Sequence, residues 1–427
     1  MWTKAAVLYH YMRYRNRGRF RSRKDIMDHQ TRRIAKHLDY VTAHSPYYAH
    51  LQGAALEAFP MMDKQKMMAD FDRINTAGIQ KEEAMAFAMD AERSRAFDAK
   101  FQGITLGLSS GTSHSRGLFL INDEEKAKWA GYVLANCLPK GILQRQSIAF
   151  FMRANSNLYE ATGQSRIQFS FYDIYEDLET HFPKLRANPP DVLVGQPSLL
   201  LMLADAMKRG KISLAPSRVI SIAELLEERD AALLKDAFHQ PLIHQVYQCT
   251  EGCLATTCAH GALHINEDIV RVDKEILQGR RFVPIITDFT RRTQPVLRYR
   301  LDDILVERES PCPCGLPFTA LEKIEGREDD VFTFYDKAGK AVLVFPDFIR
   351  RCLLFSGEVE FYRVVQEADG SLRIYINVDE ALRQNICAEF AKLAHDGQFC
   401  LPSIEFCPYE QNRLRKLKRV ESLFKRT

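Results

Sequence analysis

The sequence lacks any long hydrophobic run and any strong excess of charge of one sign. The apolar run Ala5–Leu8 is far too short for the core of a secretory signal, and no later run approaches about 20 residues. The formal net charge is only +4 over 427 residues, which gives no general electrostatic case for binding nucleic acid. We therefore expect a cytoplasmic protein with no stable membrane insertion and no nucleic-acid partner.

Internal repeats, low-complexity segments and long Gly/Ser/Pro linkers are absent as well. The hydrophobic fraction of 46% and the charged fraction of 27% are ordinary for a globular protein, which excludes disorder and collagen but selects no chemistry. A chain of this length exceeds a single core, because cores rarely grow past about 250 to 300 residues. Two domains are therefore expected.

Positive charge is concentrated locally in residues 13–24, which read RYRNRGRFRSRK and contain no acidic residue. A stretch of this kind can contact phosphates or anionic lipid. We expect it to form a solvated helix or arm.

Up to about Lys323, short strand-like runs alternate with helical patterns, which is typical of an α/β domain with a partly parallel sheet. Helices are expected after Asn122, which forms a capping box with Glu125, and from Pro197 or Ser198 to Gly210. The segment before Phe101 reads as mostly helical. The expected strands are residues 103–110, 147–152, 166–174, 192–195 and 218–223.

After Gly326 the pattern changes to that of a small α+β unit. Two strand-like runs flank Asp369-Gly370, a strong hairpin signal, and a helical stretch from Glu380 to Ala394 precedes a final strand at 403–407. We predict a large domain over residues 1–325, mostly helical over 1–100, and a small mobile lid domain over residues 326–427.

Hydroxyl residues surround a glycine in the segment 106–117, LGLSSGTSHSRG, where a strand runs into a turn. Gly111 lets the backbone approach an anion, and Arg116 adds positive charge. Such a loop can hold the polyphosphate of ATP, although the Gly-Lys-Ser/Thr ending of a Walker loop is missing. The hydroxyl donors are Ser109, Ser110, Thr112 and Ser113.

Three further motifs follow this loop in a consistent order: YQCTEG at 247–252, RYRLDD at 298–303 and GREDD at 326–330. As a set, they resemble the adenylate-forming superfamily of acyl-CoA synthetases, adenylation domains and luciferases. The resemblance is strongest to the phenylacetate-CoA ligase and coenzyme F390 synthetase branch, including its uncharacterised adenylate-forming enzymes. It runs from about Phe101 to the carboxyl end and implies the fold of that superfamily.

The resemblance gives the loop 109–113 the β- and γ-phosphates of ATP. Here His114 stands where a Gly is usual, and Arg116 replaces the usual Lys. In the second motif, Tyr247 would pack near adenine, Thr250 would bond the α-phosphate, and Glu251 would hold Mg²⁺, which prefers carboxylate oxygen. The alternative for this motif is a strand end with a solvated glutamate.

An upstream SIAE segment, with Ala223 and Glu224, resembles the turn whose backbone contacts adenine. In the third motif, Asp303 matches the acid that accepts both ribose hydroxyls, because a carboxylate offers two acceptor oxygens. Asp302 stands there in place of the usual Gly.

The resemblance also implies roles for residues of the small domain. Arg327 would reach the ribose, and Asp329 would be the pivot about which the small domain rotates between two half-reactions. Near the chain end, Lys416 matches the lysine that bridges the attacking carboxylate and the α-phosphate. Arg415 replaces the usual Gly, and Lys418 lies close enough to be tested next; a basic tail is the alternative.

Ten cysteines in a cytosolic chain should stay reduced, so clustered thiols are candidate metal ligands. Cys312 and Cys314 form a tight pair, and Cys258 and His264 can complete a closed, tetrahedral structural Zn²⁺ site. His260 is an alternative ligand and Cys253 a less favoured one. Members of the resembling branch have a zinc site in the corresponding loops; buried free thiols and a surface histidine are the alternative.

The expected substrate is an aromatic or fatty carboxylic acid, and the acceptor is coenzyme A or the phosphopantetheine of a carrier protein. The sequence leaves the oligomeric state open, and a homodimer is one of the options. Two other functions remain: AMP transfer to a phenolic hydroxyl, as in coenzyme F390 synthetase, and a non-catalytic zinc-containing protein whose basic segment binds nucleic acid. Aromatic residues at alternate positions more often belong to core strands, but they also give a candidate pocket wall, formed by Phe150, Phe151, Tyr159, Phe169, Phe171 and Tyr172.

Overall fold

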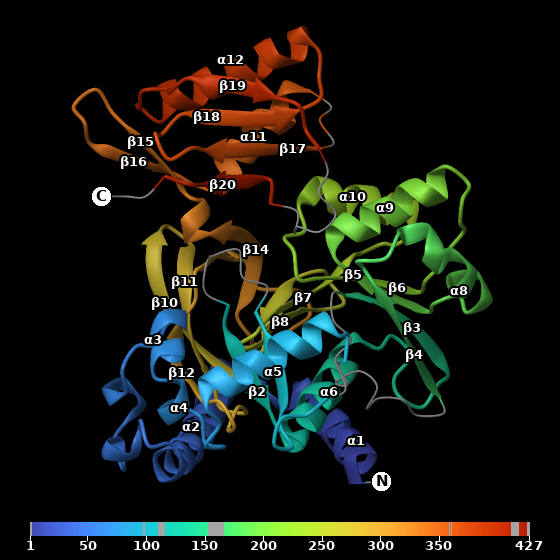
Figure 1. Cartoon of the computed structure of the whole chain (residues 1–427), viewed down its shortest axis with the longest axis vertical. Coiled ribbons are helices and arrows are strands. Elements are labelled where there is room, and N and C mark those ends of the chain that lie inside the picture. Colours follow the sequence, from blue (N-terminus) through green and yellow to red (C-terminus); the bar gives the residue numbers. More distant parts are fainter. Residues whose placement is uncertain are drawn as a thin grey trace. The chain divides into compact units, whose positions relative to one another are not determined.

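The computed structural model describes residues 2–96, 99–109, 116–152, 166–357, 359, 361–410 and 418–424 (Figure 1). The chain divides into two units. Unit 1 comprises Met1–Arg280, Pro284–Leu301 and Glu307–Glu322, and unit 2 comprises Arg281–Val283, Asp302–Val306 and Lys323–Thr427. Two short segments before Lys323 therefore belong with the carboxyl-terminal unit.

The amino-terminal segment is helical, as expected. Ser22 caps the second helix in a reciprocal capping box with Asp25. Its elements are α1 (Trp2–Arg15), η1 (Arg17–Arg19), α2 (Arg23–His44), η2 (Ala49–Leu51), η3 (Leu56–Ala58), α3 (Lys64–Ala69), α4 (Phe71–Ile74) and α5 (Lys81–Arg93).

Most basic side chains of residues 13–24 are exposed, as expected, but Arg17 is not. The Arg17 guanidinium donates hydrogen bonds to Asn266 Oδ1 at 2.7 Å and to Thr256 Oγ1 at 3.1 Å, and it lies 3.6 Å from the fully buried carboxylate of Asp268. Arg23 pairs with Glu267 at 2.5 Å. The expectation of a solvated helix or arm is therefore wrong for Arg17, whose side chain is 11% exposed, whereas the Arg23 side chain is 52% exposed at the start of α2.

Five parallel strands form one end of the large sheet, in the order β4-β3-β5-β6-β7, with β4 at the edge. The expected strands are confirmed to within a few residues at each end. Their bounds are β3 (Gln146–Met152), β4 (Ile167–Asp173), β5 (Val192–Gly195), β6 (Arg218–Ile222) and β7 (His244–Cys249).

Helices α6 (Asp123–Cys137), α8 (Phe182–Ala187), α9 (Pro197–Lys208) and α10 (Glu228–Ala237) accompany these strands. The predicted capping box of Asn122 and Glu125 is present in α6. Figure 1 shows α9 beside α10 and, elsewhere, α1 with α6. Phe150 and Phe151 belong to two different hydrophobic clusters, because adjacent strand residues point to opposite faces of a sheet.

Strand β7 is where the sheet changes from parallel to antiparallel pairing. It pairs in antiparallel fashion with β8 (Gly252–Thr257), which pairs with β9 (Leu263–Ile265); β9 in turn pairs with β14 (Ala320–Arg327) at Ala320 and Leu321. The remaining strands of this sheet are β10 (Val270–Gln278), β11 (Arg281–Asp288), β12 (Val296–Arg300) and β13 (Asp303–Glu307). A separate hairpin pairs β1 (Thr105–Leu108) with β2 (Leu118–Ile121), so the hydroxyl-rich loop connects these two strands.

Unit 2 is a small α+β unit built on a four-stranded sheet of order β19-β18-β17-β20. The predicted hairpin is confirmed between β17 (Tyr362–Gln366) and β18 (Leu372–Ile376), with Gly370 at φ +88° in its turn. Residues of α11 and α12 form one hydrophobic cluster with this sheet. The other elements are η5 (Glu328–Asp330), β15 (Phe332–Tyr335), β16 (Ala341–Val344), α11 (Pro346–Ser356), α12 (Glu380–Asp396), β19 (Ile404–Cys407) and β20 (Val420–Ser422).

Among the described residues, we find no helix that combines the length and the apolar character needed to cross a bilayer.

Candidate functional site

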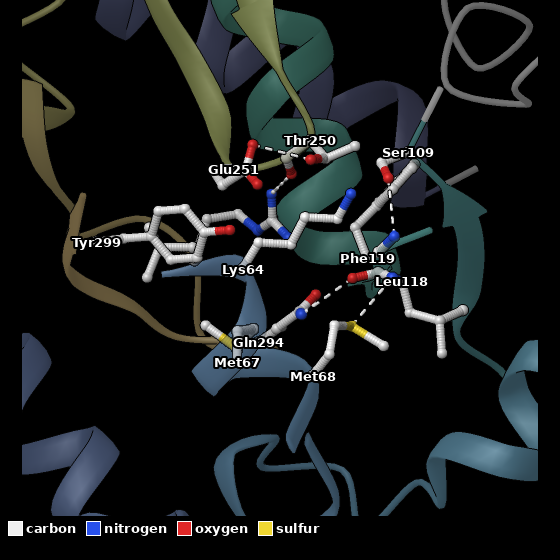
Figure 2. A pocket seen from close by; sticks show the side chains of 13 residues that line it. Lys64, Met67, Met68, Ser109, Leu118, Phe119, Thr250, Glu251, Gln294 and Tyr299 are labelled. Carbon is white, nitrogen blue, oxygen red and sulfur yellow. Dashed lines mark hydrogen bonds between the residues drawn. The ribbon is translucent and has the colours of Figure 1, made fainter. Parts of the chain in front are cut away.

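One pocket of unit 1 brings together two of the sequence motifs (Figure 2). Ser109, from the start of the hydroxyl-rich loop, lines it together with Thr250 and Glu251 of the YQCTEG motif. The other lining residues are Lys64, Met67, Met68, Gly117, Leu118, Phe119, Arg291, Gln294, Val296 and Tyr299.

Thr250 and Glu251 occupy the turn between β7 and β8. The Thr250 hydroxyl donates a hydrogen bond of 2.8 Å to Glu251 Oε2, so the two functional groups point into the same space. The strand pairing shifts register between Tyr247 and Gln248, a bulge of the kind that re-aims side chains next to active sites. A carboxylate and a hydroxyl placed in this way can bind a hard cation and a phosphate oxygen.

The Arg291 side chain hydrogen-bonds the backbone of this turn and that of β2. Its Nη1 donates to the carbonyl of Thr250 at 3.1 Å, and its Nη2 donates to the carbonyl of Leu120 at 3.1 Å. The Arg291 side chain is buried. One guanidinium therefore links the turn after β7 to β2, the strand that follows the hydroxyl-rich loop in the chain.

Ser109, at the start of the hydroxyl-rich loop, is hydrogen-bonded to Gly117 at its end. Its backbone N–H donates to the Gly117 carbonyl at 2.8 Å, and the Gly117 N–H donates to its hydroxyl at 2.7 Å. Arg116 donates from Nε to the Ser109 carbonyl at 3.1 Å and pairs through Nη1 with Glu92 at 2.7 Å. Ser110, Gly111, Thr112 and Ser113 lie outside the described residues.

Ala223 and Glu224 form a strained turn at the carboxyl end of β6. Ala223 has a φ of +65°, and the Glu224 N–H donates to the Ile222 carbonyl at 2.8 Å. Left-handed backbone at a residue other than Gly is costly and is often found at functional sites. Because Ile222 pairs in parallel with Val246, this turn follows β6 at the level where Tyr247 lies in β7.

A second group of predicted residues gathers within unit 2. Arg327 lies 3.6 Å from the carboxylates of both Asp302 and Asp303. Burial lowers the pKa of Arg327, but the nearby acids Asp302, Asp303, Asp329 and Asp330 raise it further, so the net shift is upward. Asp303, Arg327 and Asp329 thus form one charged cluster around β13 and β14.

Lys416 lies outside the described residues, whereas Lys418 is engaged in an ion pair. The Lys418 ammonium is 2.5 Å from Asp330 Oδ1 and 3.7 Å from Glu421. Burial raises the pKa of Asp330 to about 6, although the Lys418 ammonium opposes this shift. Burial lowers the pKa of Lys418, but the Asp330 carboxylate raises it further. Both groups are therefore charged at neutral pH.

The four favoured metal ligands come together in unit 1. The ligand atoms of Cys258, His264, Cys312 and Cys314 all lie within 4.8 Å of one another, whereas His260 is exposed and Cys253 is buried elsewhere. The Cys258 and Cys312 sulfurs are 3.6 Å apart, and the Cys314 sulfur is 3.3 Å from His264 Nε2. Tetrahedral bonds of about 2.0 to 2.3 Å to Zn²⁺ require spacings of about 3.3 to 3.8 Å between ligand atoms, and the Cys258–Cys312 and Cys314–His264 spacings match this range.

The surroundings of His264 also fit a metal ligand. Its Nδ1 lies 3.1 Å from the Phe318 carbonyl, which leaves Nε2 with its lone pair facing the three sulfurs. Cys258 follows β8, His264 lies in β9, and the Cys312–Cys314 pair lies in the connection from β13 to β14. Antiparallel pairing of Ala320 with His264 brings that connection to the β8–β9 hairpin.

Three members of the candidate aromatic wall are core residues, which confirms the alternative of core strands for them. Phe150, Phe151 and Tyr172 are at most 3% exposed and pack inside the sheet cores, and Phe151 stacks on Tyr172. Phe169 and Phe171 are partly buried against one of these cores, and Tyr159 lies outside the described residues. The alternation of aromatic residues along β3 and β4 therefore serves core packing.

Comparison with solved structures identifies the class of fold. No family model matches the sequence. A 2-hydroxyisobutyryl-CoA ligase in the postadenylation state with R3-HIB-AMP superposes with a TM-score of 0.67 at 15% identity, over 92% of this chain and 88% of the other. The anthranilate CoA ligase AuaEII with anthranoyl-AMP gives 0.54 at 13% identity, over 74% and 65%. The chain therefore has the fold of the adenylate-forming ligases, which confirms the expected fold class.

Two curated proteins are also similar in sequence. Protein CapK from Staphylococcus aureus is 23% identical over 359 residues, which cover 77% of this chain and 73% of CapK. Indoleacetate–lysine synthetase from Pseudomonas savastanoi is 29% identical over 139 residues, which cover 31% of this chain and 33% of that protein. The second similarity agrees with the resemblance to adenylate-forming enzymes.

Several pocket residues carry no signal in the sequence. Lys64 lies in the helical amino-terminal segment, and Arg291 and Gln294 lie in a turn after β11 that matches no motif. Tyr299 lies within RYRLDD, but the resemblance assigns no role to it. Only contacts between distant segments place these residues in the pocket; Arg291 and Leu120 are 171 positions apart.

Replacing Arg291 with Met should destabilise the protein, because the buried Leu120 carbonyl and the partly buried Thr250 carbonyl lose this donor. We expect the free energy of unfolding to fall by about 1 to 3 kcal/mol, measured by urea denaturation. Arg292→Met is the matched control: its exposed guanidinium lies over the Tyr40 ring at 4.6 Å, a contact that contributes about 0.5 to 1 kcal/mol. Equal losses in the two variants would contradict the role given to Arg291.

Proposed function

We propose that the protein activates a carboxylic acid with ATP, as an acyl-adenylate, and then transfers the acyl group to a thiol. The observation that carries this proposal is the single pocket shared by Ser109, Thr250 and Glu251. It lies in a chain whose fold is shared with CoA ligases crystallised with acyl-AMP species. The proposed location is the cytoplasm, where the ten cysteines, all free in the structure, would stay reduced.

In the first half-reaction, a carboxylate oxygen of the substrate attacks the α-phosphorus of ATP. A new P–O bond forms, the bond to the β-phosphate oxygen breaks, and pyrophosphate leaves with the electron pair. Thr250 would donate a hydrogen bond to the α-phosphate, and the loop that begins at Ser109 would hold the β- and γ-phosphates. Glu251 would hold Mg²⁺, which would neutralise phosphate charge when bound.

The remaining nucleotide contacts follow from the other motifs. We assign adenine to Tyr247 and to the strained turn of Ala223 and Glu224, whose backbone would face the base. Asp303 is assigned to the ribose hydroxyls and Arg327 to the ribose, which the charged cluster of unit 2 supports. Asp329, in the same cluster, is the proposed pivot of the lid.

In the second half-reaction, a thiol sulfur attacks the acyl carbon. The thiol loses its proton, a thioester forms and AMP leaves. The similar structures are CoA ligases by name, which supports coenzyme A as the acceptor, with the phosphopantetheine of a carrier protein as its chemical equivalent.

An amine is the second candidate acceptor. The partial similarity to an indoleacetate–lysine synthetase, whose name joins an acid and an amino acid, favours it. The first half-reaction would be the same, and an amine nitrogen would then attack the acyl carbon to form an amide and release AMP. The two functions therefore share the nucleotide site and differ only in the acceptor.

A screen for ATP–pyrophosphate exchange tests the proposed function. The full chain with Mg²⁺ should exchange labelled pyrophosphate into ATP only when the right aryl or fatty acid is present. Coenzyme A and amino acids are then added separately, to see which one consumes the acyl-adenylate. Hydroxylamine should trap the activated acid as a hydroxamate, whereas AMP transfer to a phenol would give a stable AMP ester. Absence of exchange with every acid, together with salt-sensitive binding of DNA or RNA, would favour the nucleic-acid function instead.

Lys416→Ala should lower acid-dependent ATP–pyrophosphate exchange by about 100-fold or more, because one positive charge would no longer offset the charge developing at the α-phosphate. Lys418→Ala is the informative comparison. Its ammonium is already held by Asp330, so we expect a smaller loss from this variant. Exchange close to the wild-type rate in Lys416→Ala would remove the catalytic assignment, and a large loss only in Lys418→Ala would transfer it.

We further propose that Cys258, His264, Cys312 and Cys314 hold one structural Zn²⁺ ion. The mutual distances and the orientation of His264 support a closed site with no open position for substrate. Burial raises the pKa of Cys314 to about 12 and lowers that of His264. A bound cation would reverse this cost of burial, because it stabilises the thiolate form of cysteine.

Cys314→Ser should reduce bound zinc from about one ion per chain to well below half, and it should lower the melting temperature, because the site would lose a thiolate ligand. Metal content is measured by mass spectrometry on protein purified without chelator. His260→Ala is the control, since His260 is exposed and lies outside the cluster. Full zinc content in Cys314→Ser, or loss of zinc in His260→Ala, would refute the assigned ligands.

A further inference from the structure

The pocket of unit 1 contains a cation that none of the motifs supplies. Two basic side chains line it, Lys64 and Arg291. The terminal nitrogens of Arg291 are occupied by the carbonyls of Thr250 and Leu120. Within the part of the chain that the structure describes, the Lys64 ammonium has neither an acidic partner nor a hydrogen bond. Lys64 is therefore the positive charge that the pocket can offer to a ligand.

The chain holds Lys64 in place by its backbone. Met62 forms a bridge with Tyr299: its N–H donates to the Arg298 carbonyl at 3.0 Å, and its carbonyl accepts from the Arg300 N–H at 2.8 Å. Asp63 then caps α3 by accepting from the Lys66 N–H at 2.8 Å. Lys64 thus begins a helix that is anchored to β12 on the pocket wall.

The aliphatic part of the Lys64 side chain lies next to Gly117, which has no side chain. A Cβ added to Gly117 would lie 3.3 Å from Lys64 Cε and 3.5 Å from Ser109 Oγ. The end of the Lys64 side chain is therefore next to the start of the hydroxyl-rich loop. Figure 2 shows this side chain extended across the pocket, toward the side where Thr250 and Ser109 lie.

The cation expected at this loop is engaged elsewhere. Arg116 follows the hydroxyl residues in the sequence, but its guanidinium pairs with Glu92 and donates to the Ser109 carbonyl. A loop that binds the polyphosphate of ATP needs positive charge, because the two outer phosphates carry most of the negative charge of the nucleotide. Lys64 lies at the same loop and is not committed to another acid.

We propose that Lys64 binds the β- and γ-phosphates of the nucleotide, so that the helical amino-terminal segment supplies the cation of the phosphate site. This inference rests on the nucleotide site proposed above. It assigns Lys64 to nucleotide binding rather than to the attack on the α-phosphorus. A nucleotide that has only an α-phosphate makes no use of Lys64.

The test compares MgATP with AMP as ligands of the full chain, by isothermal titration calorimetry. Lys64→Gln retains most of the stem beside Gly117 and removes the charge. We expect it to weaken MgATP binding by about 10- to 100-fold, the range for a lost charge-assisted hydrogen bond, and to leave AMP binding unchanged. Lys66→Gln is the matched control, because Lys66 is 57% exposed, donates to the Met61 carbonyl and does not line the pocket.

Each outcome decides between the two proposals. A wild-type chain that binds neither MgATP nor AMP would remove the nucleotide site and this inference with it. Wild-type affinity for MgATP in Lys64→Gln would refute the role of Lys64 and leave the nucleotide site intact. Equal weakening of MgATP and AMP in this variant would also overturn the inference, since the effect would not be specific to the outer phosphates.

Discussion

The organisation of the site depends on the change of strand direction at β7. Parallel strands β5, β6 and β7 all end at one edge of the sheet, which is where open α/β sheets bind ligands. The turn from β7 into antiparallel β8 then projects Thr250 and Glu251 from that edge, next to the strained turn after β6. The candidate site therefore lies where the pairing pattern changes, and Arg291 holds that point by two backbone carbonyls.

Local signals in the sequence were sufficient for most of the fold. The apolar run at 192–195 is β5 itself, the Asn122–Glu125 capping box begins α6, and Asp369-Gly370 turns the hairpin of unit 2. These features depend on neighbouring residues, so periodicity and turn chemistry reveal them. The Cys/His cluster was predictable for a related reason, because a C-x-C pair and a Cys/His pair have few other uses in a reduced protein.

The remaining features depend on contacts between distant parts of the chain. The sequence does not indicate that the segments 281–283 and 302–306 belong to the carboxyl-terminal unit, or that Asp303 goes with them. The aromatic residues of β3 and β4 could not be assigned from the sequence, because strand alternation is the same for a core and for a pocket wall. Arg116 matched a motif position, but Glu92, 24 positions before it, takes up its charge.

The burial of Arg17 also constrains the order of events during synthesis. Its acceptors Thr256 and Asn266 lie 239 and 249 positions downstream, beyond the whole parallel sheet. At about 5 to 20 residues per second, a ribosome makes these acceptors roughly 12 to 50 seconds after the arginine itself. Arg17 can therefore reach these two acceptors only after the whole parallel sheet has been synthesised.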